Sequence, residues 1–191
     1  MNYGAVKRIK NNENNVYLTF DDGPEPDITQ FVLNELDKYD FKATFFCKGQ
    51  NVENYPELLR EIVKRGHSLG NHTYEHKHAY QRNVVTYLAD VEKADIILHT
   101  YLFRPPNGCL KWSAWLQLRR KYKIIYWSIG SGDSQKETFD FDKCMSRLKN
   151  TKAGDISLFH FCVEHQYGTR MILPAYLKWI KEQGLTSKII E

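Results

Sequence analysis

Short runs of β-branched and aromatic residues alternate along the chain with longer segments whose apolar residues recur at three- and four-residue spacing. The first pattern is typical of strands and the second of amphipathic helices. Their regular alternation predicts an α/β fold in which crossover helices join parallel strands, as an open sheet or a closed barrel. The predicted strands or strand ends are 15–20, 42–49, 67–72, 101–106, 123–130 and 155–161, and the predicted helices are 27–40, 56–66, 84–99, 112–122, 141–150 and 170–184.

The boundaries of the first two helices carry their own signals. Asp27 precedes the first helix as an N-cap, and Pro56 and Gly66 suit the start and the end of the second. The chain has 191 residues, which is enough for one domain with a substantial core, and no linker, repeat or low-complexity segment divides it. We therefore expect a single domain over residues 1–191, with its core at about 16–191.

The composition of the chain indicates which partners and cellular locations to expect. The formal net charge is +4 and the charges are scattered, so nucleic acid is a poor candidate partner. No apolar run reaches membrane-spanning length, so we expect no transmembrane segment, and the first residues lack the apolar stretch of a signal peptide. We therefore expect a cytoplasmic protein, although a secreted chain trimmed of its leader would look the same. The 4 widely spaced cysteines favour reduced, buried thiols over disulfides.

Ionisable residues follow the predicted strands. Parallel strands bring their C-terminal ends to one edge of the fold, where the sites of α/β barrels and open α/β sheets are assembled. We therefore expect the chemistry of this protein to gather at that edge. The residues at or just after strand ends are Asp21, Asp22, His72, Arg104, Asp133 and His160.

The segment TFDDGP contains two adjacent like charges, Asp21 and Asp22, so a cation is expected nearby. If the segment after Asn71 is helical, His72 and His76 lie on one helix face and can reach one metal ion. Two neutral histidines and one carboxylate make a three-ligand site with an open position, and the other aspartate stays free to act as a base. Alternatively, the two histidines are a solvated pair on a helix surface.

Two further segments each have a functional and an ordinary interpretation. In RPPNG, a rigid turn could hold Arg104 against a carboxylate and aim the backbone N–H of Asn107 at an oxyanion; otherwise it is an exposed surface turn. His160 ends an apolar strand and is either a hydrogen-bonded core residue or a catalyst. Asp133 either caps a turn or orients His160 and raises its pKa.

Taken in order, the segments TFDDGP, HTYEH, RPPNG, WSIGSGD and LFH resemble the five motifs of the NodB-homology polysaccharide deacetylases, carbohydrate esterase family four. The resemblance runs from about Tyr17 to the C-terminus. It implies a distorted (β/α) barrel, and one divalent metal ion with zinc as the expected metal. It also implies an N-acetylated glycan or glycolipid as the substrate.

The same resemblance implies a role for each motif residue. Asp21 matches the general base, and Arg104 matches the arginine that positions it. Asn107 matches the backbone donor to the oxyanion, and His160 matches a general acid that Asp133 assists. The residues that match the metal ligands are Asp22, His72 and His76.

Four positions depart from the family's pattern. Asn107 stands where tyrosine is usual, so a sugar-contacting ring is lost although the backbone donor remains. Gly130 replaces a common acidic residue, and Ser134 replaces the usual tryptophan, so part of the apolar wall beside the acetyl group must come from elsewhere. Phe161 stands where aspartate often follows the histidine. These changes spare the metal and acid/base residues but put the family's familiar substrates in doubt.

The leading hypothesis is a metal-dependent hydrolase that removes the N-acetyl group from an amino sugar in an oligosaccharide, polysaccharide or glycolipid precursor and releases acetate. An O-acetyl esterase on the same scaffold is the nearest alternative, because only the leaving group differs. A carbohydrate-binding relic without turnover is an alternative from a different class. Outside the motifs, we expect Trp112 and Trp115 in the core rather than on a sugar-binding surface, and His67 in a structural role.

Overall fold

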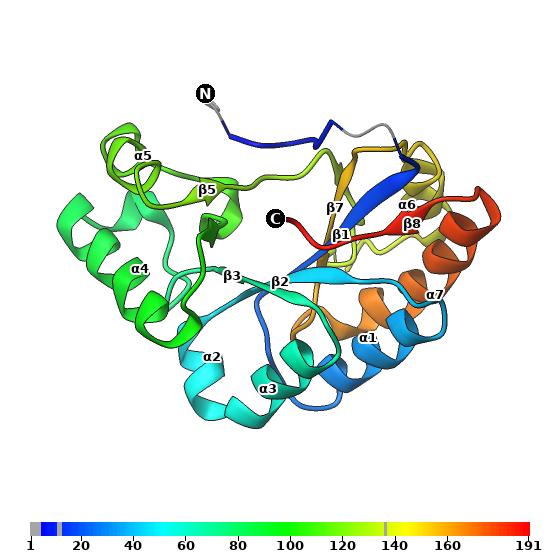
Figure 1. Ribbon diagram of the computed structural model, residues 1–191, viewed down its shortest axis with the longest axis horizontal. Coiled ribbons are helices and arrows are strands. Elements are labelled where there is room, and N and C mark those ends of the chain that lie inside the picture. Colours follow the sequence, from blue (N-terminus) through cyan, green and yellow to red (C-terminus); the bar gives the residue numbers. More distant parts are fainter. Residues whose placement is uncertain (1–4, 11–12, 136) are drawn as a thin grey trace.

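Parallel strands form the centre of the computed structural model, which describes residues 5–10, 13–135 and 137–191 (Figure 1). The strands are β1 (Asn15–Asp21), β2 (Ala43–Cys47), β3 (Ser68–Asn71), β4 (Leu102–Phe103), β5 (Lys123–Ile124), β6 (Ile129–Gly130), β7 (Ile156–His160) and β8 (Thr186–Ser187). Their order across the sheet is β5-β4-β3-β2-β1-β7-β6, and β8 pairs with β1 outside this path. Neighbouring strands are parallel at every pairing in this order, as the alternating pattern predicts.

Helices connect the successive strands from β1 to β8, except β5 and β6, and cover the outside of the curved sheet (Figure 1). They are α1 (Ile28–Asp37), α2 (Gly49–Asn54), α3 (Pro56–Lys64), α4 (Val84–Leu98), α5 (Trp112–Leu118), α6 (Phe141–Leu148) and α7 (Gln166–Glu182), with 3-10 turns η1 (Ala79–Gln81) and η2 (Pro106–Gly108). The predicted α/β class and distorted barrel are confirmed. None of the helices in the described ranges has the length and apolar character needed to cross a membrane.

The segment predicted as one strand, 123–130, is two short strands at opposite ends of the sheet path. β5 pairs with β4, whereas β6 pairs with β7. The residues between them therefore cross the opening of the barrel. On the way, Ile125 forms an isolated bridge with Val6, and the N-terminal segment continues to a second bridge between Arg8 and Asp155. Residues before the predicted core boundary thus contribute to the barrel.

The central strand β1 explains how one short segment builds both the core and the site. Side chains alternate between the two faces of a strand, so every second residue shares a face. Leu18 and Phe20 are fully buried in the layer between sheet and helices, where Phe20 stacks on Phe45 with ring centroids 5.1 Å apart. Tyr17 faces a separate apolar cluster inside the barrel. The same alternation carries Asp21 to the barrel interior at the end of the strand.

Several smaller expectations have clear outcomes. Asp27 occupies the N-cap position of α1, but its side chain makes no capping hydrogen bond. His67 is structural: burial lowers its pKa to about 4, and its neutral Nδ1 accepts the Ala43 N–H at 3.2 Å. All 4 cysteines are free, as expected, and Cys109 is half-buried while the others are buried. The prediction that Trp112 is buried in the core is wrong, because this residue lies on α5 and is 49% exposed.

Gly168, in the first turn of α7, lies directly against the loop after β6. A Cβ atom at this position would lie 2.2 Å from the carbonyl oxygen of Asp133. We expect Gly168→Ala to reduce the free energy of unfolding in urea by about 1–3 kcal/mol or more, because backbone must move. Gly130→Ala is the control, because its Cβ would meet Trp127 at 3.7 Å, an ordinary contact. Equal stability of both variants would contradict the prediction.

Candidate active site

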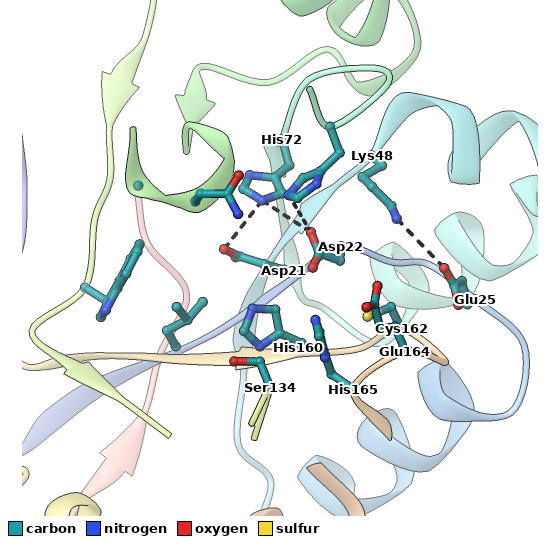
Figure 2. Close-up of a pocket in the computed structure, with 15 residues that line it drawn as sticks. Asp21, Asp22, Glu25, Lys48, His72, Ser134, His160, Cys162, Glu164 and His165 are labelled. Atoms are coloured by element: carbon teal, nitrogen blue, oxygen red, sulfur yellow. Dashed lines mark ion pairs between the residues drawn. The ribbon is translucent and has the colours of Figure 1, made fainter. Parts of the chain in front are cut away.

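A cavity of about 340 Å³ opens where the strands of the barrel end. Figure 2 shows the side chains that surround it, drawn from the ends of several strands and the loops that follow them. Its lining includes Asp21, Asp22, His72, His76 and His160, and the apolar residues Trp127 and Leu158. Arg104 and Asp133 are buried behind the lining residues, at 0% and 1% exposure. The structure thus brings the strand-end residues of the sequence together.

Asp22, His72 and His76 form a group able to hold a metal ion. One ligand atom from each lies within 4.8 Å of the others. Oδ1 of Asp22 lies 3.5 Å from Nε2 of His72 and 3.0 Å from Nε2 of His76 (Figure 2). This oxygen is buried and has no hydrogen-bond partner among the described residues, a costly state that a bound cation would relieve. The residues present therefore fit a divalent cation.

The protonation state of this group also suits a metal. Burial opposes the charge of Asp22, but His72 and His76 outweigh burial and hold the pKa of Asp22 well below its usual range. Nδ1 of His72 lies 2.7 Å from the carbonyl oxygen of Arg104, so the proton of this ring belongs on Nδ1. Such a contact leaves the Nε2 lone pair free for a metal and fixes the orientation of the ring.

The helix that the sequence allowed for the segment after Asn71 does not form. The Thr73 N–H bonds to the side chain of Asn71 at 2.8 Å, and the His76 N–H bonds to the Thr73 hydroxyl at 3.0 Å. Side-chain acceptors that take backbone N–H groups compete with a helix. Thr73 and His76 accordingly have φ values of 64° and 58°. The loop brings His72 and His76 together by this route, with ring centroids 4.9 Å apart.

Arg104 orients Asp21 from inside the barrel. Its Nη1 donates to Oδ1 of Asp21 at 2.7 Å and to the Thr19 hydroxyl at 2.8 Å. Nε and Nη2 donate to the backbone carbonyls of Ile125 and Tyr126. Burial lowers the pKa of Arg104, and the Asp21 carboxylate opposes that shift. The guanidinium is therefore fixed on several sides, and it is a buried residue rather than part of an exposed surface turn.

His160 and Asp133 form a second buried pair on the other side of the cavity. Nδ1 of His160 lies 2.9 Å from Oδ1 of Asp133, and the His160 N–H donates to Oδ2 at 2.7 Å. Burial lowers the pKa of His160, but the Asp133 carboxylate outweighs burial and raises that pKa to about 9. Ser131 and Thr169 also donate to Asp133, at 2.7 and 2.9 Å. The buried Asp133 carboxylate therefore favours the protonated form of the imidazole.

The four residues that depart from the family's sequence pattern lie at different positions in the structure. Asn107 lines the cavity within η2, where its φ of 55° turns the chain. Ser134 also lines the cavity, and Trp127 and Leu158 provide its apolar wall. Phe161 is fully buried and packs on Gly23, where a Cβ would come within 2.4 Å of the phenylalanine ring. Gly130 is the last residue of β6.

The sequence reasoning missed other residues of this cavity, which are Glu25, Lys48, Cys162, Glu164 and His165. Lys48 directly follows β2, so the strand-end rule could have found it. Cys162 and His165 follow β7 within the segment HFCVEH, which holds further residue types that bind metals. Thr169 carried no comparable signal, because its contact with Asp133 joins α7 to a distant loop.

The family model described as Polysaccharide deacetylase matches residues 8–124. The chain belongs to this family. A peptidoglycan-N-acetylglucosamine deacetylase of Bacillus cereus is 31% identical over 183 residues, which cover 92% of this chain and 86% of that protein. A chitooligosaccharide deacetylase of Azorhizobium caulinodans is 30% identical over 170 residues, covering 82% and 78% of the two chains.

The fold of this polysaccharide deacetylase is shared with a solved relative. A crystal structure of a peptidoglycan N-acetylglucosamine deacetylase, in complex with 4-naphthalen-1-yl-N-oxidanyl-benzamide, superposes with a TM-score of 0.90. The two chains are 27% identical, and the match covers 98% of this chain and 91% of that one. The protein is thus a hydrolase of the deacetylase type.

Proposed function

We propose that this deacetylase removes the acetyl group from an N-acetylated amino sugar in a glycan or glycolipid, in a metal-dependent reaction that releases acetate. One observation carries the proposal: Asp22 with His72 and His76, Asp21 held by Arg104, and His160 held by Asp133 all meet at a single cavity. The printed activities of the relatives, on peptidoglycan N-acetylglucosamine and chitooligosaccharide, support this class of substrate.

Asp22, His72 and His76 would hold the metal ion, for which we propose zinc. Two imidazoles and one carboxylate suit zinc in a catalytic site, because three protein ligands leave a position open. Bound there, the ion would polarise the acetyl carbonyl and make water more acidic. Asp21 is not a member of this ligand group, and it is held instead by Arg104.

The other residues divide the proton transfers between them. Asp21 takes a proton from the attacking water, while the hydrogen bond from Arg104 holds the carboxylate in position. The backbone N–H of Asn107 donates to the oxyanion that forms on the carbonyl oxygen when water adds to the acetyl carbon. Protonated His160 then gives its proton to the sugar nitrogen as the C–N bond breaks, because an unprotonated amine is a poor leaving group. The products are acetate and a free amino sugar.

Acetate release tests the proposal directly. With zinc supplied, the protein should release acetate from an N-acetylated chito-oligosaccharide faster than from an acetylated xylan, which reports O-acetyl esterase activity. A chelator should abolish the release and added zinc should restore it. Preference for the xylan would favour the esterase. No release from a broad panel of acetylated glycans would favour a binding relic.

The pH profile of turnover should report His160. The protonated ring is the acid in our proposal, so kcat should fall as pH rises through the pKa of this residue, about 9 in the metal-free protein. A bound cation nearby lowers that pKa, so the fall should lie at or below pH ~9. Asp133→Asn removes the charge that raises the pKa, and should move the fall to lower pH. An unchanged alkaline limb in this variant would contradict the assignment.

A further inference from the structure

A second group of metal-binding side chains lies around the same aspartate. One ligand atom from each of Asp22, Cys162 and His165 lies within 4.8 Å of the others. Cys162 and His165 lie in the short loop between β7 and α7. In Figure 2 they stand below Asp22, whereas His72 stands above it. The proposed deacetylation uses neither Cys162 nor His165, so these residues need a separate explanation.

The loop that carries these two residues is held in place. Cys162 is 3% exposed, and its main-chain carbonyl accepts the His165 N–H at 3.2 Å. Between them, the Val163 N–H donates to the Glu25 carboxylate at 2.7 Å. A loop fixed at both its middle and its end presents its side chains in a defined arrangement, which is what a metal site requires.

An unsatisfied polar atom distinguishes this group from an ordinary buried contact. Nδ1 of His165 is buried without a hydrogen-bond partner among the described residues. Buried polar atoms are normally paired, and an unpaired one raises the free energy of the folded protein. A cation between these side chains would satisfy such atoms without any change in the fold.

Asp22 can serve both groups at once. A carboxylate has two oxygens with about four lone-pair directions in total, so it can bridge two cations. Hydrolytic enzymes with two metals hold them about 3.5–4 Å apart, a spacing that a shared carboxylate allows. Asp22 is the member common to both groups.

We propose that Asp22, Cys162 and His165 form a second cation site, which shares the Asp22 carboxylate with the site of His72 and His76. The site takes a divalent ion that accepts sulfur, such as Zn²⁺, because thiolate and imidazole ligands select such ions. Binding releases the proton of the Cys162 thiol. Three protein ligands leave a position for water or another ligand. The inference goes beyond the proposed deacetylation and does not depend on it.

Cobalt provides the probe, because a thiolate bound to Co²⁺ gives a charge-transfer band in the near ultraviolet that imidazole and carboxylate ligands do not. Metal-free protein, reduced and without oxygen, should bind about two Co²⁺ ions per chain and develop this band. Cys162→Ser should lose the band and bind about one ion. Cys109→Ser is the matched control, because this half-buried cysteine belongs to neither ligand group, and it should keep the band.

Two further variants separate this site from the first. His72→Ala should lose about one ion and keep the band, since His72 belongs only to the first group. His165→Ala, with its folding checked by circular dichroism, should weaken binding of the second ion by about tenfold or more. A single ion without the band in the wild type, two ions without the band, or a band that persists in Cys162→Ser would each overturn the second site. The acetate assay is unaffected by these outcomes, so the proposed function would stand or fall separately.

Discussion

Replacing Asp21 with asparagine should reduce the rate of acetate release by about 10²–10⁴-fold, the usual contribution of a general base. The amide keeps the shape of the side chain but cannot take a proton from water. Its carbonyl oxygen can still accept the hydrogen bond from Arg104, which lies 2.7 Å from Oδ1 in the wild type. Asp21 is outside both ligand groups, so the variant should retain its metal.

The measurement pairs acetate release with metal content in the same preparation. Asp155→Asn is the matched control: Asp155 is also a fully buried aspartate paired with an arginine, Arg8, at 2.7 Å. It lies next to the start of β7, at the opposite end of that strand from His160. This control should lose stability without losing the turnover of the folded protein. A wild-type rate in Asp21→Asn would remove Asp21 from the role of base, and loss of metal would make it a ligand instead.

Replacing Asp22 with alanine should release the metal and bring acetate release down to background. The carboxylate is the charged ligand of the group, and without it two neutral imidazoles remain. Losing a contact that merely orients a ligand weakens metal binding by about 10–100-fold, so losing the ligand itself should cost more than about a hundredfold. His72 keeps its contact with the Arg104 carbonyl, so the surrounding loops should stay folded.

Metal content after dialysis and competition with a chelator of known affinity measure this effect. His78→Ala is a suitable control, because His78 lies in the same loop region but its Nδ1 accepts the Tyr80 N–H and it joins neither ligand group. The control should keep its metal. Stoichiometric metal in Asp22→Ala would show that the cation binds elsewhere and would remove the proposed mechanism.

The sequence predicts correctly those strands and helices whose pattern lies within the segment itself. In β1, apolar residues at alternate positions predict a strand, and its C-terminal end puts Asp21 at the rim without knowledge of the other strands. The division of 123–130 into β5 and β6 was not predictable in this way. Both halves are apolar, and the break exists only because each pairs with a different strand, β4 or β7.

The site shows the same division between local and distant causes. Convergence of residues at strand ends follows from parallel pairing, so it could be predicted. A helix from Asn71 to His76 remained possible from the sequence, because the spacing of two histidines does not reveal that the Asn71 and Thr73 side chains accept backbone N–H groups. Arg104 is completely buried, and its guanidinium donates to the carbonyls of Ile125 and Tyr126, which lie far along the chain. The motif RPPNG alone does not reveal these partners, so an exposed surface turn remained an alternative.

The tight packing of α7 against the Asp133 backbone limits how the substrate pocket can be redesigned. A Cβ atom at position 168 would collide with the Asp133 carbonyl oxygen, and the neighbouring Thr169 donates to the Asp133 carboxylate, so the two segments are packed as one unit. Restoring a tryptophan at position 134 by grafting the loop of a relative would therefore require the first turn of that relative's helix as well. Libraries for directed evolution of the substrate pocket should therefore vary the two segments together.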